Sequence, residues 1–290
     1  MASCLVRGSR RASAPIRAER PRPGARRFRR WPGHYRGSVA ADPLVPLLSL
    51  ADVAPAVERA RERVDAALRH RALRRQGGRV AAEVSLRSAI ASAALEGHVH
   101  EREAVRAGVV TDPVLQGALR VAEALPALAD RWPRAPRQVL ARLHTLAAAG
   151  TVPPEALGRP VAGAAEGSTP LVAARLDILA GLVTGGTRVP QVLLAAVVHG
   201  ELLALRPFAG PAGVVARAAG RLTLLAGGFD PRGLVAVDLG HREREPEYVG
   251  AANAFATGTP DGVRSWLRHY MTAVEIGAER MVEIADDVLG

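Results

Sequence analysis

The sequence contains no lysine, and cysteine, asparagine and aromatic residues are scarce. All 39 basic residues are arginine, Cys4 is the one cysteine, and aromatic residues make up 3% of the 290 positions. A single cysteine excludes an intramolecular disulfide and is typical of a reducing compartment, so we expect a cytoplasmic protein. Because Asn253 is also the one asparagine, the bias indicates a GC-rich genome, and arginine content by itself is weak evidence of function.

Long hydrophobic runs are absent as well. No stretch reaches the roughly 18 uninterrupted apolar residues of a membrane span, and no apolar segment follows the basic start as it would in a signal peptide. We therefore expect no contact with a membrane. Hydrophobic residues still make up 48% of the chain, which predicts a sizeable core of leucine, valine and alanine.

The positive charge is concentrated at the N-terminus. Residues 1–36 hold eleven arginines and one acid, so they carry +10 of the net charge of +11. Residues 1–38 also lack apolar periodicity, which predicts a disordered basic tail. Such a tail could bind nucleic acid, or it could be a solvated extension or the product of an upstream start codon. We favour the last two interpretations because stacking aromatics are few.

Helical periodicity dominates the rest of the chain. Asp52 is a candidate N-cap for a first helix that reaches Leu73, and a second helix covers residues 80–97, with Gly97 as its C′ residue. Further helices are predicted over 115–128, 135–148, 171–183, 190–205, 213–226, 246–256 and 261–288. No segment shows the alternation of a strand. We expect one all-α domain, a helical bundle over residues 39–290.

The segment 206–217 reads RPFAGPAGVVAR, a Pro/Gly-rich loop that leads into a helix of small residues. A helix N-terminus after such a loop presents unpaired N–H groups and the positive end of the helix dipole, which suits an anion such as phosphate. The order of residues resembles the active-site loop of the Fic (Fido) family of AMP-transferases, H-x-F-x-(D/E)-G-N-G-R-x-x-R. Phe208, Gly213 and Arg217 match it. The resemblance covers most of residues 80–285 and implies a Fic-like helical bundle in which these three residues contact a nucleotide or anion.

Five specified positions of the motif differ, and each difference removes a function that the resemblance implies. Arg206 stands in place of the histidine that accepts the target's proton, and a guanidinium stays protonated at physiological pH. Gly210 replaces the acid that holds Mg²⁺. Pro211 and Ala212 replace a Gly-Asn pair that contacts phosphate, and Val214 replaces the first arginine. Without the base and the metal ligand, we expect no useful AMP transfer and no Mg²⁺ site.

A second part of the resemblance lies upstream of the loop. Ser92, Glu96 and Gly97 match the pattern (S/T)-x-x-x-E-(G/N) of the family's inhibitory helix, whose glutamate enters the nucleotide site and pairs with the motif's last arginine. The resemblance thus implies a salt bridge between Glu96 and Arg217, retained here as a structural pair. The alternative is two unrelated surface residues at the ends of their helices.

Other candidate features have simpler explanations. The resemblance implies a target-gripping hairpin over residues 151–170, but this Pro/Gly/Ala-rich segment lacks the β-branched residues of a strand. His199 is a conceivable substitute base, although so apolar a helix more often contains a hydrogen-bonded core histidine. His98 and His100 have the spacing of a metal pair but lack a third ligand, so we interpret them as surface residues.

Three hypotheses for the function remain. The first is a Fic-like protein without transferase activity that binds a nucleotide or anion weakly, with ATP as the implied ligand, and serves a protein partner as a regulatory module. The second is a transferase with a changed mechanism that still modifies protein hydroxyls. The third is nucleic-acid binding through the tail. The five altered motif positions favour the first.

Overall fold

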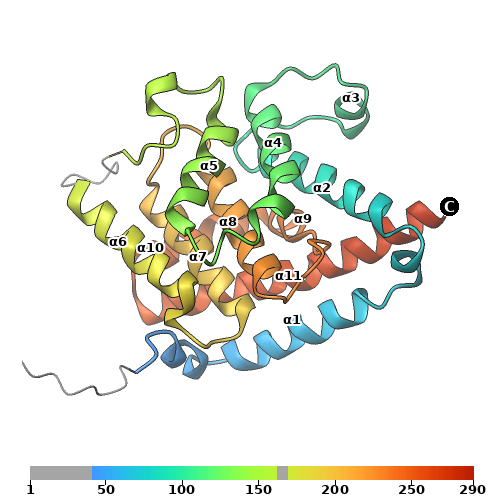
Figure 1. The fold of residues 1–290 in the computed structure, drawn as a ribbon. Coiled ribbons are helices and arrows are strands. Elements are labelled where there is room, and N and C mark those ends of the chain that lie inside the picture. Colours follow the sequence, from blue (N-terminus) through green and yellow to red (C-terminus); the bar gives the residue numbers. More distant parts are fainter. Residues whose placement is uncertain (1–40, 162–168) are drawn as a thin grey trace, which may run out of the picture. The chain divides into compact units, whose positions relative to one another are not determined.

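The computed structural model describes residues 41–161 and 169–290, and the predicted tail of residues 1–38 lies outside these ranges. The α-helices within them, drawn in Figure 1, are α1 (Val53–Ala67), α2 (Gly77–Ala94), α3 (Arg102–Arg106), α4 (Pro113–Leu128), α5 (Pro136–Ala148), α6 (Thr169–Gly181), α7 (Gln191–Leu205), α8 (Ala212–Ala226), α9 (Val237–Glu243), α10 (Glu245–Ala256) and α11 (Pro260–Leu289). No β-strand occurs in the described ranges; Ala149 and Val152 form an isolated bridge. The all-α prediction is confirmed.

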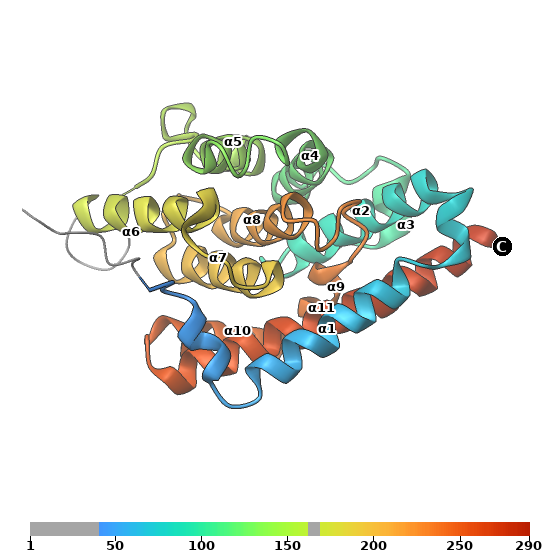
Figure 2. The same ribbon diagram turned by 60° about the horizontal axis from the view of Figure 1, so that its bottom comes forward.

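Helices α7 and α8 form the centre of the bundle. Every residue of α7 from Val192 to Gly200 is buried, and so is every residue of α8 from Ala212 to Gly220. Such continuous burial requires apolar or small residues almost all round a helix rather than on one stripe; His199 and Arg217 are the polar exceptions in these two runs. Figure 2 shows α4 and α5 on one side of this pair and α1, α10 and α11 on the other. The loop 206–211 between the two central helices therefore starts and ends on well-packed elements.

Seven helices begin and end within two residues of the predicted limits. A π-helical turn, Leu182–Gly186, follows α6 and was not predicted. Three details of the first helices are wrong. The helix predicted to reach Leu73 ends at Ala67, and Leu73 lies in a separate 3₁₀ helix, Arg71–Arg74. Asp52 does not cap α1, because its backbone is left-handed (φ 65°) and its carboxylate instead lies 3.0 Å from Arg264 Nη2 of α11. The helix predicted over 80–97 ends at Ala94, so Glu96 lies in the turn after α2. Gly97 has the predicted positive φ, 89°, which suits a C′ residue.

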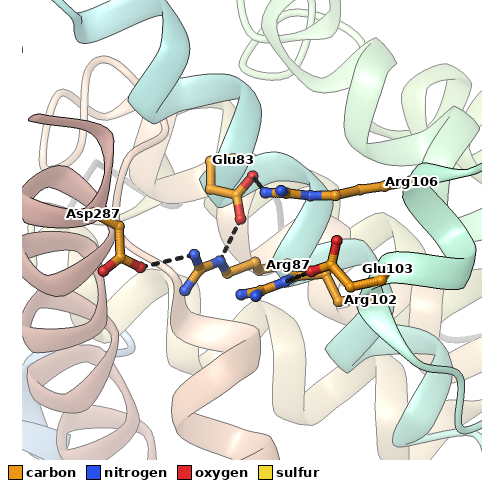
Figure 3. A network of polar contacts seen from close by, with 6 residues as sticks. All are labelled: Glu83, Arg87, Arg102, Glu103, Arg106 and Asp287. Carbon is orange, nitrogen blue, oxygen red and sulfur yellow. Dashed lines mark hydrogen bonds and ion pairs between the residues drawn. The ribbon is translucent and has the colours of Figure 1, made fainter. Parts of the chain in front are cut away.

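Ion pairs fix the middle of α2 to its neighbours, as Figure 3 shows. Arg87 Nε lies 2.5 Å from Glu83 Oε1, and Arg87 Nη2 lies 3.0 Å from Asp287 Oδ2 near the end of α11. Arg106 of α3 also contacts Glu83. Burial raises the pKa of Glu83, but hydrogen bonds and charges from the two arginines outweigh it, so the pKa is lowered overall. This network holds the helix that precedes Glu96 at two points.

Candidate functional site

A pocket of about 500 Å³ opens at the loop between α7 and α8. Its wall is formed by the turn after α2, the ends of α7 and α8 that meet at the loop, and one face of α10. The residues that line it are Leu95, Glu96, Leu203, Ala204, Arg206, Ala212, Gly213, Arg217, Tyr248, Val249, Ala252, Asn253 and Ala256. Four of the predicted site residues therefore share one pocket, because Glu96, Arg206, Gly213 and Arg217 all belong to its wall.

The predicted ion pair is present at this wall. Arg217 Nη2 lies 2.7 Å from Glu96 Oε1, and the exposed fractions of the two side chains are 1% and 18%. The alternative of two unrelated surface residues is therefore wrong. Arg217 is a buried charge at the base of the pocket, and Glu96 is its carboxylate partner on the solvent side.

The other nitrogens of the Arg217 guanidinium are also bonded. Nε donates to Ser92 Oγ at 2.8 Å, Nη2 to the Ser92 carbonyl at 2.8 Å, and Nη1 to the Tyr248 hydroxyl at 3.2 Å. Burial opposes the charged form, but the neighbouring Tyr248, Glu96 and Asp238 outweigh it, so the pKa of Arg217 is raised. Ser92, expected beside the pair, thus contributes two acceptors. The guanidinium is held on every side and is rigid.

Gly213 makes room for the carboxylate. A Cβ atom at this position would lie 2.0 Å from Glu96 Oε1 and 2.9 Å from Arg217 Nη1. No side chain can fit there while the ion pair is in place. Since α8 begins at Ala212, the Glu96 carboxylate rests against the first turn of this helix, where the helix dipole favours negative charge. The Glu96 carboxylate therefore occupies the position, at the N-terminus of α8, where the sequence predicted a bound anion.

Two of the loop positions that differ from the motif, Arg206 and Gly210, have left-handed backbones. Arg206 is exposed, and it ends α7 in a left-handed conformation with φ 44°. Gly210 has φ 71°, and a Cβ atom there would lie 2.9 Å from Val152 Cγ1 and 3.2 Å from Thr151 Oγ1. An acid at residue 210 would therefore meet both steric contact and backbone strain. The conformation of the loop therefore favours glycine at residue 210.

Phe208 does not line the pocket. It is 4% exposed and stacks on His144 of α5, with ring centroids 4.7 Å apart. His144 Nε2 lies 2.9 Å from the Ala209 carbonyl, and the Gly158 N–H donates to His144 Nδ1 at 2.9 Å. Burial lowers the pKa of His144 despite its bond to Ala209, in keeping with a neutral ring that donates from Nε2. Phe208 thus anchors the loop to the core, a contact that the sequence analysis missed because His144 gives no signal within its helix.

His199 is a core residue, as its apolar helix suggested. It is 1% exposed, and its Nε2 lies 3.1 Å from the Tyr248 hydroxyl. That hydroxyl links His199 to Arg217, but His199 itself does not reach the pocket. It belongs to a buried group with His241, His269 and Trp266, in which His241 Nδ1 lies 3.1 Å from His269 Nε2. These residues come from three helices, so sequence spacing gave no indication of the group.

His98 and His100 share one acid. His98 Nδ1 lies 2.7 Å and His100 Nε2 lies 3.2 Å from Asp112 Oδ2. The other oxygen of Asp112 accepts from the N–H groups of Val114 and Leu115 and so caps α4. The two histidines are partly buried at this cap rather than free on the surface as predicted. Within the described ranges, no group of three or more His, Cys, Asp or Glu side chains is arranged to hold a metal ion.

Magnesium does not fit the pocket. Glu96 is the one carboxylate among the lining residues, and it is bound to Arg217. Mg²⁺ prefers carboxylate oxygens and substrate phosphates in a near-octahedral arrangement. A carboxylate that already neutralises a buried guanidinium is a poor ligand, and residue 210 offers none.

Arg221 lies one turn after Arg217 on α8 and is also largely buried. Its side chain is 11% exposed, and Nη1 lies 3.4 Å from Asp238 Oδ2. Asp238 itself is 3% exposed. Burial raises the pKa of Asp238 even though Arg221 and Arg217 oppose this effect. Helix α8 therefore carries two largely buried arginines one turn apart.

No family model matches the chain, and no curated protein matches its sequence. Solved structures match it at low identity. A crystal structure of a Fic family protein from Desulfovibrio desulfuricans G20 has 21% identity and a TM-score of 0.63, and the match covers 79% of this chain and 74% of that one. A fragment of Fic-1 from C. elegans has 18% identity and a TM-score of 0.65 and covers 83% and 75%; a point variant of it has 18% and 0.63 and covers 82% and 74%.

The chain therefore has the Fic fold, as its motif resemblance implied. The TM-scores of 0.63 and 0.65 establish the arrangement of helices. At identities of 18–21% the chemistry has to be argued from the pocket. Among the described residues, no helix is both long and apolar enough to cross a membrane.

Proposed function

We propose that the protein is a Fic-fold binding or regulatory module that has lost AMP transfer, and that its pocket accepts a nucleotide or another anion weakly. One observation carries the proposal: the pocket wall contains no histidine, and its one carboxylate is committed to Arg217. Transfer to a hydroxyl needs a group that accepts the proton, and a positioned base contributes about 10²–10⁴ in rate. Arg206 cannot supply this, and His199 lies outside the pocket.

The charges of the pocket explain why binding should be weak. Arg206 and Arg217 attract an anion, as does the N-terminus of α8. The Glu96 carboxylate opposes it, because it neutralises Arg217 and lies within the same wall. Binding should not depend on Mg²⁺, since no free carboxylate lines the site. A ligand that carries its own negative charge therefore competes directly with Glu96.

The test compares the wild type with Glu96→Ala by calorimetric titration of ATP, with and without Mg²⁺. We expect millimolar binding by the wild type and at least about tenfold tighter binding by the variant, since a like charge has been removed at short range. Glu123→Ala is the matched control, because Glu123 is an exposed acid on α4 outside this pocket. Equal affinities in all three proteins would contradict the proposed competition.

A transfer assay separates this proposal from an inhibited but active enzyme. Wild type and Glu96→Ala are incubated with labelled ATP, Mg²⁺ and hydroxyl-bearing protein substrates, and adducts are sought by mass spectrometry. We expect no AMP adduct with either protein. An adduct that appears with Glu96→Ala and disappears when Arg217 is also replaced would show that the enzyme is active.

A further inference from the structure

A second cavity, of about 590 Å³, lies between α2, α4 and α8 and the segment that joins α8 to α9. Ligand sites in proteins have volumes of roughly 300–1,000 Å³, so its size suits a small organic molecule. None of its lining residues belongs to the pocket around Glu96. It is built on the opposite half of α8, from Arg221 onward.

The floor of the cavity is apolar, and its exposed rim combines prolines with charged residues. Ala122 and Leu125 of α4 and Leu224 of α8 are buried and form the floor. The exposed rim includes Pro126 and Pro231, whose rings restrict the backbone. An apolar floor in contact with water is unfavourable until something covers it. A rigid rim also means that a ligand does not have to order the site on binding.

Arg221 gives the cavity a specific polar group. Its one hydrogen bond in the described residues is the long contact of 3.4 Å from Nη1 to Asp238. Its Nε and Nη2 have no acceptor there, and neither is among the fully buried atoms that lack a partner. Arg221 lines the cavity, so these two donors, which are not fully buried, are available to a ligand there. They present the two adjacent N–H directions that a carboxylate accepts.

The other charges of the wall fix the charge of the ligand. Arg134 and Arg232 lie on the exposed rim and add to the positive charge. Asp130 is on the rim too, while both oxygens of Asp230 accept N–H groups of the following turn, from Leu234 and Val235. With Asp238, the partner of Arg221, three arginines face three acids, so the wall suits a monoanion held by its arginines better than a phosphate dianion.

We propose that this cavity binds a small organic carboxylate with an apolar body. The carboxylate accepts hydrogen bonds from Arg221 Nε and Nη2, and the apolar body covers the floor formed by Ala122, Leu125 and Leu224. Arg134 and Arg232 attract the anion at the rim. The site and the Glu96 pocket have no lining residue in common.

The test uses octanoate as the probe and calorimetry as the readout. We expect one binding site with a Kd below about 1 mM. Octan-1-amine and inorganic phosphate each carry only part of the required chemistry, and each should bind at least about tenfold more weakly. Binding of octan-1-amine as tight as that of octanoate would overturn the role of Arg221, and phosphate binding as tight as octanoate would overturn the apolar body.

Variants locate the site. Ala129→Trp fills the cavity, since Ala129, the C-cap residue of α4, lines it, and should weaken octanoate binding at least about tenfold. Ala127→Trp is the matched control, because Ala127 is exposed on the same helix and does not line the cavity; it should leave the Kd unchanged. Arg221→Gln would leave Asp238 unpaired and risks misfolding, so the double variant Arg134→Gln/Arg232→Gln tests the charge, with an expected loss of about tenfold. Octanoate binding that is absent, or that is unaffected by Ala129→Trp, would refute the proposal.

Discussion

Replacement of Glu96 by alanine should destabilise the domain, because it leaves the Arg217 charge buried without a carboxylate. The Arg217 side chain is 1% exposed, and its nearest carboxylate is that of Glu96, at 2.7 Å. After the substitution the guanidinium would keep its bonds to Ser92 and to the Tyr248 hydroxyl. These acceptors are neutral, so they solvate the charge only in part.

The expected loss lies between two known limits. Breaking a fully buried pair by removal of one partner costs about 3–5 kcal/mol, and loss of an exposed pair costs about 0–1 kcal/mol. Glu96 is 18% exposed and lines a pocket of about 500 Å³, so water can enter beside Arg217 when the carboxylate is gone. We therefore expect a loss of about 2–3 kcal/mol in the free energy of unfolding, below the buried limit.

Urea unfolding followed by circular dichroism measures this loss, and thermal unfolding should show a fall in Tm of roughly 4–12 °C for a domain of this size. Glu123→Ala is the control, since an exposed acid without a partner in the described residues should change stability by less than about 0.5 kcal/mol. A double-mutant cycle with Arg217→Met isolates the pair. If Glu96→Ala and Glu123→Ala unfold at the same urea concentration, the ion pair contributes nothing and the argument fails.

Two further predictions follow from the same region. Gly213→Ala should lower the free energy of unfolding by about 2 kcal/mol or more, since its methyl group displaces Glu96. Gly250→Ala, at an open position of α10, should raise it by about 0.5–1 kcal/mol. Two variants that are both more stable or both less stable than the wild type would contradict this. Stability should also fall in acid, because burial lowers the pKa of three core histidines, in one case to about 4. These histidines bind protons near pH 6.5 in the unfolded chain but not in the folded core. The free energy of unfolding is therefore at its full value above about pH 6.5 and declines below it by up to about 1.4 kcal/mol per pH unit for each histidine. Equal urea midpoints at pH 7.5 and pH 5 would refute this. The histidines are His199, His241 and His269.

The sequence predicted the main helices because proline and glycine mark their ends. Pro113, Pro136, Pro190 and Pro260 each lie at or just before a first helical residue, where their fixed φ is favourable. The short helices α3 and α9 were missed, because five to seven residues give too few turns for periodicity to show. Asp52 shows a further limit. A capping residue is recognised by its type, but the cap also needs an extended backbone, which a sequence does not reveal.

The candidate site was predicted in part, and the division has a physical reason. The contact between Glu96 and Arg217 could be expected because the motif resemblance implies that these two residues meet in space. Their spacing along the chain does not imply this. The grouping of the core histidines could not be expected, since His199, His241 and His269 approach one another only when α7, α9 and α11 pack. The same holds for the stacking of Phe208 on His144. Local patterns predict elements, whereas buried polar groups depend on how the elements meet.

The ion pair can persist without any regulatory role, and this bears on how the pocket should be interpreted. Loss of either partner alone leaves the other as an uncompensated charge, whereas joint replacement by apolar groups is often neutral or stabilising. Replacement of the pair by an apolar contact needs two substitutions, and the protein with only the first of them is less stable, whichever residue changes first. No such barrier protects Arg206 or Gly210, which are the exposed residues of the loop 206–211 and have no buried charged partner in the described residues. A pocket whose wall has no histidine and no free carboxylate but contains the Glu96–Arg217 pair is therefore what stability alone would produce. Measured destabilisation by Glu96→Ala without any gain of transfer would support this explanation, and a gain of transfer without destabilisation would reverse it.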